Sequence, residues 1–151
     1  MSESGKYLMF MGEYNHTLDT KGRLTIPSKL RDGLGESFVV TKGMDGCLFV
    51  YGLTEWEVFA EKLRSLPMVD KKTRQFTRFF LAGADTVTVD KMGRILLPHN
   101  LREFADINKD AVLIGVGNRV EIWSKERWEG TVSFEDMDEI AGHMLDIGIG
   151  I

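Results

Sequence analysis

Two arginines occupy the same place in two copies of one short motif, Asp-x-x-Gly-Arg. The two copies comprise Asp19, Gly22 and Arg23, and Asp90, Gly93 and Arg94. A guanidinium group is a planar fork of donors that fits a carboxylate, a phosphate, or the O6 and N7 edge of guanine. Each aspartate can pair with its arginine across the turn, or it can orient that arginine toward nucleic acid. The residues alone favour the simple ion pair, although an exposed pair contributes little stability.

The motif belongs to a longer internal repeat. Residues 19–31 and 90–102 are offset by 71 positions and are identical at six of 13 positions. Unrelated segments of ordinary composition share roughly one. A chain of two copies tends toward a pseudo-twofold unit with two similar surfaces. We therefore divide the chain into residues 9–82 and 83–151, joined in one compact unit, and expect residues 1–8 to be disordered.

Charge is unevenly distributed along the chain. The 151 residues carry a net charge of −4, which at first argues against nucleic acid. However, the segment from Glu129 onward has six acids and no Lys or Arg, so residues 1–128 sum to +2. Phosphate binding depends on the local field, so an acidic total does not exclude a basic face. We expect the acidic segment to lie away from any bound phosphate.

Composition places the chain among globular proteins of the cytoplasm. Its apolar content of 43% suits an ordinary core, and no apolar run reaches the length of a membrane helix. The first residues do not resemble a signal peptide. A single cysteine, Cys47, rules out an internal disulfide and suits a reducing compartment.

Secondary-structure signals recur in both halves and predict an α+β protein. Strands are expected at 14–18, 24–26, 38–41 and 47–51, and again at 86–89, 95–97, 112–114 and 119–123. The glycine of each motif is expected to turn the chain back so that its flanking strands form a hairpin. Further hairpins are expected around Met44-Asp45-Gly46 and Gly117-Asn118.

Helices are expected after each set of strands. Pro27 and Pro98 suit the first position of short helices. Thr54 with Glu57 forms a capping-box pattern, and Asp70 is the expected cap of the next helix. Ser124 and Ser133 are expected to begin the last two helices, the final one with an apolar stripe. The expected stripe comprises Phe134, Met137, Ile140, Ala141, Met144 and Leu145.

Patterns for catalysis are weak. His16, His99 and His143 lack metal-ligand spacing, and Cys47 lies in an apolar strand pattern. Gly115-Val116-Gly117 lacks the third glycine and the following helix of a dinucleotide loop. We therefore expect no enzyme, no cofactor and no metal site.

The residues carry a family resemblance. The opening from Met9 to Arg23, the doubled Asp-x-x-x-Arg motif and the segment Arg78–Ala84 resemble MraZ proteins, bacterial transcription regulators encoded at the head of the division and cell-wall gene cluster. The resemblance implies a β-barrel of the AbrB-like swapped-hairpin type, formed by two internal repeats with helices after each half. It also implies ring-like homo-oligomers that bind G-rich direct repeats in double-stranded DNA upstream of their own operon, and hence a nucleoid-associated protein.

With this resemblance, the arginine of the first copy is favoured as a base contact. Met92 and Asn100 replace Lys21 and Lys29 in the second copy, which makes its DNA role weaker. For Lys29 and Arg31 a solvated helix face remains an alternative. The candidate DNA-binding residues are Lys21, Arg23, Lys29, Arg31, Arg94 and Arg102, and the candidate motif-orienting residues are Asp19, Asp90, Gly22 and Gly93. The alternative function is an AbrB-like antitoxin or protein-binding scaffold.

Overall fold

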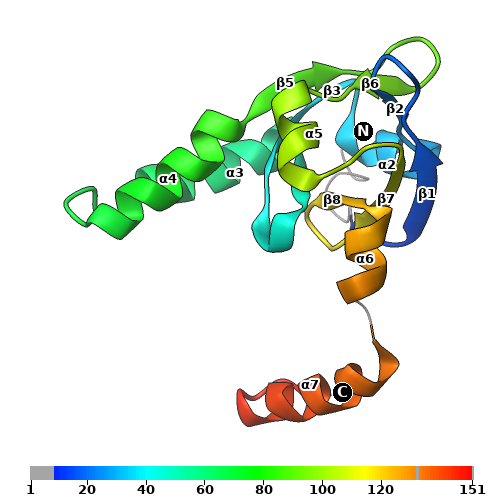
Figure 1. Ribbon diagram of the computed structural model, residues 1–151. Helices are drawn as coiled ribbons and strands as arrows, with labels where there is room; N and C mark the ends of the chain where they lie inside the picture. The colour runs from blue at the N-terminus through cyan, green and yellow to red at the C-terminus, as the bar shows by residue number, and fades with distance from the viewer. Residues whose placement is uncertain (1–8, 132, 151) are drawn as a thin grey trace.

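The computed structural model describes residues 9–131 and 133–150 and has an α+β fold, as the sequence predicts. The expectation of disorder at residues 1–8 lies outside the described residues. Strands form the body of the molecule, while helices α3 and α4 project from it as a pair (Figure 1).

Six strands form one antiparallel sheet in the order β1-β7-β8-β4-β3-β5. They are β1 (Glu13–Thr17), β3 (Ser37–Lys42), β4 (Leu48–Gly52), β5 (Asp85–Thr88), β7 (Asp110–Gly115) and β8 (Val120–Ser124). Two short strands, β2 (Arg23–Thr25) and β6 (Arg94–Leu96), form a separate antiparallel ribbon. Within the described residues the edge strands β1 and β5 are not paired with each other, so the hydrogen-bonded sheet is open.

Two of the predicted hairpins are confirmed and two are wrong. β3 pairs with β4 around the turn η1 (Met44–Gly46), and β7 pairs with β8. The strands that flank the two motif turns do not pair with each other. Instead β1 pairs with β7 and β2 with β6, while β5 pairs with β3. The exchange buries Leu24 and Ile95 side by side, which three-residue strands of one half alone would not achieve.

Two apolar clusters cover the two faces of the six-stranded sheet. One contains Leu24 and Ile95 with Leu30 and Leu101 from the short helices that follow each motif. The other is aromatic, and it packs Phe49 and Trp123 against side chains of α3, α4 and α6. The first cluster therefore packs against the buried side of the β2–β6 ribbon.

The short helices α2 (Ser28–Leu34) and α5 (His99–Ala105) begin one residue later than predicted. Pro27 and Pro98 occupy the N-cap position, and their carbonyls accept the first helical hydrogen bonds. This difference lies within the usual uncertainty of a helix boundary. The expected order of motif, proline and helix is confirmed in both halves.

The capping predictions have mixed outcomes. Helix α3 (Leu53–Arg64) starts directly after β4 with Gly52 as its N-cap, so the capping box of Thr54 and Glu57 is wrong: Thr54 already lies inside the first turn. Asp70 caps α4 (Lys71–Gly83) by accepting a hydrogen bond from the Thr73 amide, as predicted. Ser124 and Ser133 likewise accept hydrogen bonds from the first turns of α6 (Lys125–Thr131) and α7 (Phe134–Asp146).

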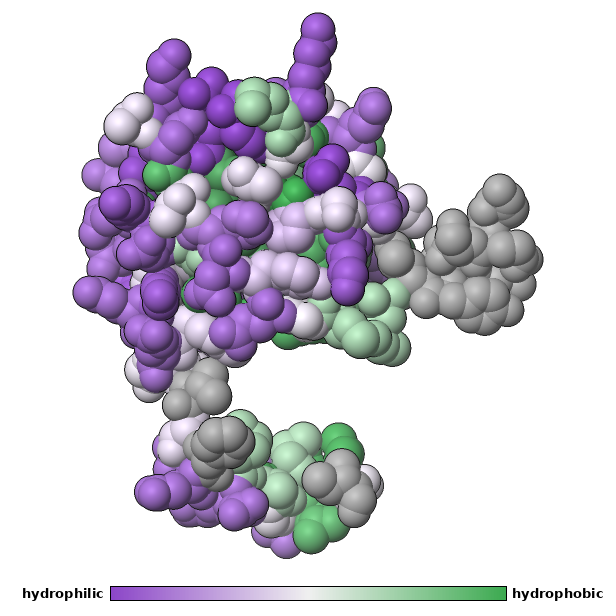
Figure 2. All heavy atoms as spheres, turned by 90° about the vertical axis from the view of Figure 1, so that its right-hand side faces the viewer, coloured by the Kyte–Doolittle hydropathy of each residue, from purple (hydrophilic) through white to green (hydrophobic). Residues whose placement is uncertain are grey.

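Helix α7 lies apart from the body, at the opposite end of the molecule from the two motif turns (Figure 1). Figure 2 shows hydrophobic surface on this helix and space between it and the body. The side chains of Met137, Ile140 and Leu145 are exposed. None of the helices in the described part of the chain combines the length and apolar character needed to span a membrane.

Candidate nucleic-acid interface

The two motif turns have the same hydrogen-bond geometry. Oδ1 of Asp19 accepts the backbone amides of Lys21 and Arg23 at 3.0 and 2.9 Å, and Oδ2 accepts Nε of Arg23 at 2.6 Å. In the second turn Oδ1 of Asp90 accepts the amides of Met92 and Arg94, and Oδ2 accepts Nε of Arg94, all at 2.9 Å. A carboxylate that binds its own turn in this way explains the need for aspartate at the first position.

Gly22 and Gly93 are required by the backbone of these turns. Their φ angles are 84° and 80°, in the left-handed region that other residues rarely adopt. Space is limited as well, because a Cβ at Gly22 would lie 2.9 Å from Nη1 of Arg102. A Cβ at Gly93 would lie 3.1 Å from Cζ of Arg31. Each glycine thus lets an arginine from the other half pack over its turn.

The β2–β6 ribbon presents the two motif arginines on one face. Arg23 lies opposite Leu96 in the register, and Thr25 lies opposite Arg94. Side chains directly opposite in an antiparallel pair share a face, and the intervening pair Leu24–Ile95 points into the core. The outer face of the ribbon is therefore formed by both arginines together with Thr25 and Leu96.

An ion-pair contact also connects the two turns. Nη1 of Arg94 lies 3.9 Å from Oδ2 of Asp19, so this carboxylate serves both arginines. Hydrogen bonds from the Arg23 amide and guanidinium and from the Lys21 amide lower the pKa of Asp19 from 3.8 to about 2. The equivalent bonds from Arg94 and Met92 lower the pKa of Asp90. Both carboxylates are therefore charged at neutral pH, and both arginines are held by their Nε edge.

The structure places Arg31 and Arg102 differently from the other candidates. Nε of Arg31 donates to the carbonyl of Ile26 at 2.9 Å, and Nη2 of Arg102 donates to the carbonyl of Asn108 at 3.2 Å. Their guanidinium groups lie over the glycines of the opposite turns. Arg31 and Arg102 consequently pack one half against the other, at the edge of the ribbon face that carries the motif arginines. Lys21 and Lys29 are exposed.

Reasoning from the sequence missed Lys91 and Leu96 near the turns, and it treated Met92 only as the loss of a lysine. Lys91 is exposed next to the second turn, so the two copies differ less in charge than Met92 and Asn100 suggest. Met92 and Leu96 are apolar but largely exposed, at 71% and 62%. When the two copies are aligned, Met92 and Leu96 occupy the positions of Lys21 and Thr25. This replacement of polar by apolar residues could have identified them as candidate contact residues.

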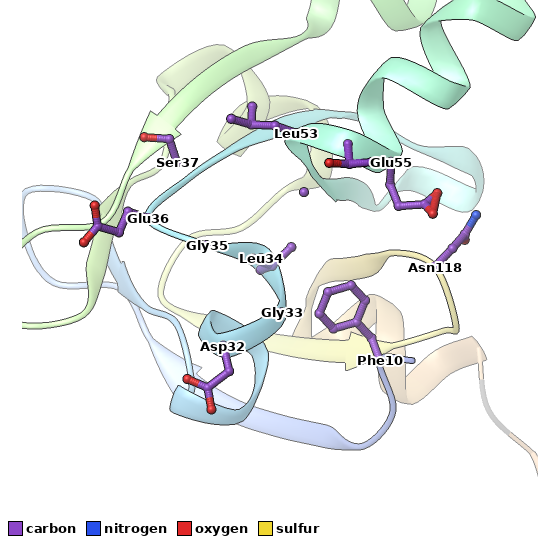
Figure 3. A pocket seen from close by; sticks show the side chains of 12 residues that line it. Phe10, Asp32, Gly33, Leu34, Gly35, Glu36, Ser37, Leu53, Glu55 and Asn118 are labelled. Carbon is purple, nitrogen blue, oxygen red and sulfur yellow. The ribbon is translucent and has the colours of Figure 1, made fainter. Parts of the chain in front are cut away.

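A cavity of about 690 Å³ lies away from this basic ribbon face, between α2 and the start of α3. Figure 3 shows the Phe10 ring in this space, with Glu55 on α3 beside it. Asp32 and Glu36 also line the cavity. Three carboxylates disfavour a phosphate ligand here, so we do not assign the nucleic-acid interface to the cavity.

The remaining chemistry-bearing residues are dispersed. Cys47 is fully buried and its Sγ donates to the carbonyl of Met44, as expected for a core residue. Burial raises the pKa of its thiol to about 12. Among residues 9–131 and 133–150, no group of three or more His, Cys, Asp or Glu side chains is placed to hold a metal ion.

Two matching turns and a shared ribbon define an α+β protein built from two copies of one unit, with both motif arginines on one face. The chain matches the family described as "MraZ protein, putative antitoxin-like" over residues 9–79 and 80–143. A protein of Lachnoclostridium phytofermentans named "Transcriptional regulator MraZ" is 58% identical over 141 residues, covering 93% of this chain and 99% of that protein. One of the same name from Clostridium acetobutylicum is 56% identical over 142 residues, covering 93% and 100%. The chain belongs to the MraZ family.

Proposed function

We propose that this protein is a sequence-specific DNA-binding transcription regulator and that the β2–β6 ribbon with its two turns faces the DNA. The observation that carries the proposal is the pair of identical turns, side by side, each holding an arginine by its Nε. The names of the homologous proteins support regulation of transcription. We also propose that the protein acts in the cytoplasm, on the nucleoid, as the resemblance to MraZ proteins implies.

The aspartates have a positioning role in this proposal. Each carboxylate accepts a hydrogen bond from Nε of its arginine, and no hydrogen bond among the described residues uses a terminal nitrogen of Arg23 or Arg94. Nη1 of Arg94 also lies 3.9 Å from Oδ2 of Asp19, so Arg23 is the arginine whose terminal nitrogens are more available. Two such donors match O6 and N7 of guanine, the commonest specific arginine contact. Lys21 and Lys91 in the two turns and Lys29 in α2 are exposed, and they would bind phosphates with no sequence preference of their own. Arg31 and Arg102, at the edge of this face, would add to its positive electrostatic potential.

The shape of the ribbon supports the same assignment. The major groove accommodates a two-stranded β ribbon, whose outward side chains then reach base edges. Leu24 and Ile95 anchor the ribbon on the core, so its outer face is held rigidly. We also propose that the arrangement around the two turns is of the AbrB-like swapped-hairpin type, since each turn is packed by the other half.

We further propose that copies of this chain assemble through α7 and α4. Asp136 and Asp138 flank the exposed apolar stripe of α7, and α7 contains no Lys or Arg. Helix α4 contains no acid, and it exposes Lys72 one turn before the exposed Phe76 and Arg78 one turn before the exposed Leu81. Two α7 helices would repel each other, whereas α7 of one copy complements α4 of the next in both charge and apolar surface. A head-to-tail contact of this kind closes into rings or extends into filaments.

The resemblance suggests the target: G-rich direct repeats upstream of the protein's own division and cell-wall gene cluster. A single net-acidic chain would hold DNA weakly at physiological salt. An assembly presents several ribbons, so after one engages, the next meets its repeat at high effective concentration. Neighbouring ribbons would reach the same side of the duplex when repeats are about 10 bp apart.

The alternative function is an AbrB-like antitoxin, a role that the family description mentions, or a protein-binding scaffold. An antitoxin usually joins one copy of the motif to a disordered tail that binds the toxin. This chain has two copies and a helical C-terminal segment, which favours the regulator. A scaffold that binds only protein would show no salt-dependent association with DNA.

A footprint on the DNA upstream of the protein's own gene tests the proposal directly. We expect protection of two or more direct repeats, and affinity that falls steeply with salt. In a gel-shift series, moving one repeat by half a helical turn should weaken binding far more than moving it by a full turn. Tight specific binding to a lone repeat would contradict the multivalent mechanism, and a lack of any footprint would contradict DNA regulation.

A further inference from the structure

Leu96 and Met92 are apolar side chains that the fold leaves exposed within the arginine face. A single exposed apolar residue is ordinary on a protein surface. These two differ because of their position: they lie on the ribbon and on the turn that the proposed function directs toward DNA. Neither side chain belongs to an apolar cluster of the core. Packing within the subunit therefore does not explain their exposure.

The register places Leu96 between the two motif arginines. It lies directly opposite Arg23 across the ribbon and two residues from Arg94 along the same strand. Both relationships put the three side chains on one face. Opposite Cβ atoms in such a pair are about 5 Å apart. A surface laid against this face of the ribbon would therefore meet Leu96 together with both arginines.

The DNA major groove offers one apolar group to such a side chain. Thymine presents its C5 methyl on the groove edge, whereas the other base edges offer donors and acceptors. When an arginine binds guanine, an adjacent leucine reaches the edge of a neighbouring base pair. There it removes a thymine methyl from water, while a polar edge at the same place loses its hydration.

We propose that Leu96 selects thymine next to the guanine read by the motif arginines. This inference rests on the proposed DNA-binding function. Since the first copy has Thr25 and Lys21 at the equivalent positions, the preference for an apolar base edge comes mainly from the second copy. The two copies thus contribute unequally: the first supplies more charge and the second supplies base discrimination through an apolar contact.

The test uses the full chain and a pool of random-sequence DNA duplexes. Wild-type protein selects its preferred duplex, and each thymine of that duplex is then replaced singly by uracil, which removes only the C5 methyl. We expect one replacement near the selected guanine to weaken wild-type binding about fourfold, the effect of burying one methyl group. Leu96→Asn should bind the thymine and uracil duplexes equally.

Leu53→Asn is the matched control, because Leu53 is an exposed leucine at the start of α3, outside both the ribbon and the proposed contact between α7 and α4. This variant should keep the full wild-type penalty for uracil. If wild-type protein enriches a sequence but tolerates every uracil, or if Leu96→Asn keeps the fourfold penalty, the assignment of Leu96 is overturned. If wild-type protein enriches no sequence at all, the proposed DNA-binding function fails first.

Discussion

Arg94 of the second turn lies within ion-pair distance of Asp19 of the first turn, with 3.9 Å between Nη1 and Oδ2. The described residues contain no reciprocal pair between Arg23 and Asp90. Asp19 therefore holds two guanidinium groups, and the pseudo-twofold symmetry of the motif is broken at its charged centre. Arg94 is also the less exposed of the two arginines, at 23% against 32%.

This asymmetry predicts that Arg23 contributes more to DNA binding than Arg94. Arg23→Ala should weaken specific binding by roughly 1–3 kcal/mol if its side chain reads a base. Arg94→Ala should cost less, because its guanidinium is partly committed to Asp19. Binding of both variants to one promoter fragment, with melting temperatures as the folding control, decides the matter. Equal or reversed losses would contradict the prediction.

Asp19 should make the free energy of unfolding depend on pH in the acidic range. Its pKa is about 2 in the folded state, against an ordinary 3.8, so it stabilises the fold above pH 3.8. That contribution is lost as the pH falls through 3.8 toward 2. Asp19→Asn should therefore flatten the fall in the urea midpoint over this window. Asp90→Asn should have an effect of the same sign, and an unchanged pH profile in the Asp19 variant would refute the prediction.

Reversing charge beside the α7 stripe should disrupt assembly. Asp136→Lys with Asp138→Lys should weaken association about tenfold, since like charges then face α4. Lys72→Glu with Arg78→Glu in α4 should act similarly, and combining all four changes should restore the particle size measured by sedimentation. Arg74 is avoided because its guanidinium already binds the carbonyls of Met68 and Val69.

A matched control for this experiment is Glu139→Lys with Asp146→Lys. It alters net charge equally, but the helical period places both residues opposite the stripe. This control variant should form particles of the same size as the wild-type protein, as measured by sedimentation. Failure of the fourfold variant to recover association would exclude pairing of α7 with α4 while leaving the ribbon proposal intact.

The Cys47 thiol should react only when the protein unfolds. Burial raises its pKa to about 12 from 9.0, which lowers the thiolate fraction on the order of 1,000-fold. Labelling by a thiol reagent at pH 8 should be slow in the native protein and fast in guanidinium chloride. Fast labelling of the native protein would show that the β3–β4 region opens readily.

Local patterns predicted much of the fold. Alternation and turn residues predicted the β3–β4 and β7–β8 hairpins, and a side chain able to accept an amide predicted the caps at Asp70 and Ser133. The proline after each motif correctly predicted that the helices α2 and α5 follow it. These features depend on residues within a few positions of one another, where the sequence carries the physical cause directly.

Contacts between the halves could not be predicted in the same way. The alternation of Leu24 with polar neighbours shows which side is buried, but it does not say which strand lies beside it. Arg31 and Arg102 appeared to be free charges because their partners, the opposite glycine turns, are more than 50 residues away. Thr54 fitted a capping pattern, but β4 runs into α3 and places the helix start earlier.

The pairing of β1 with β7 has a consequence for synthesis of the protein. Glu13 pairs with Ile114 and Thr17 with Asp110, so β1 has no ladder partner until residues 110–114 have left the ribosome. At about 5–20 residues per second the nascent chain spends roughly 5–20 s with this strand edge unpaired. The pairing of β1 therefore forms late in synthesis, although β3, β4 and β5 can pair earlier. Proteases or chaperones that act on the emerging chain encounter β1 before its partner strand is available.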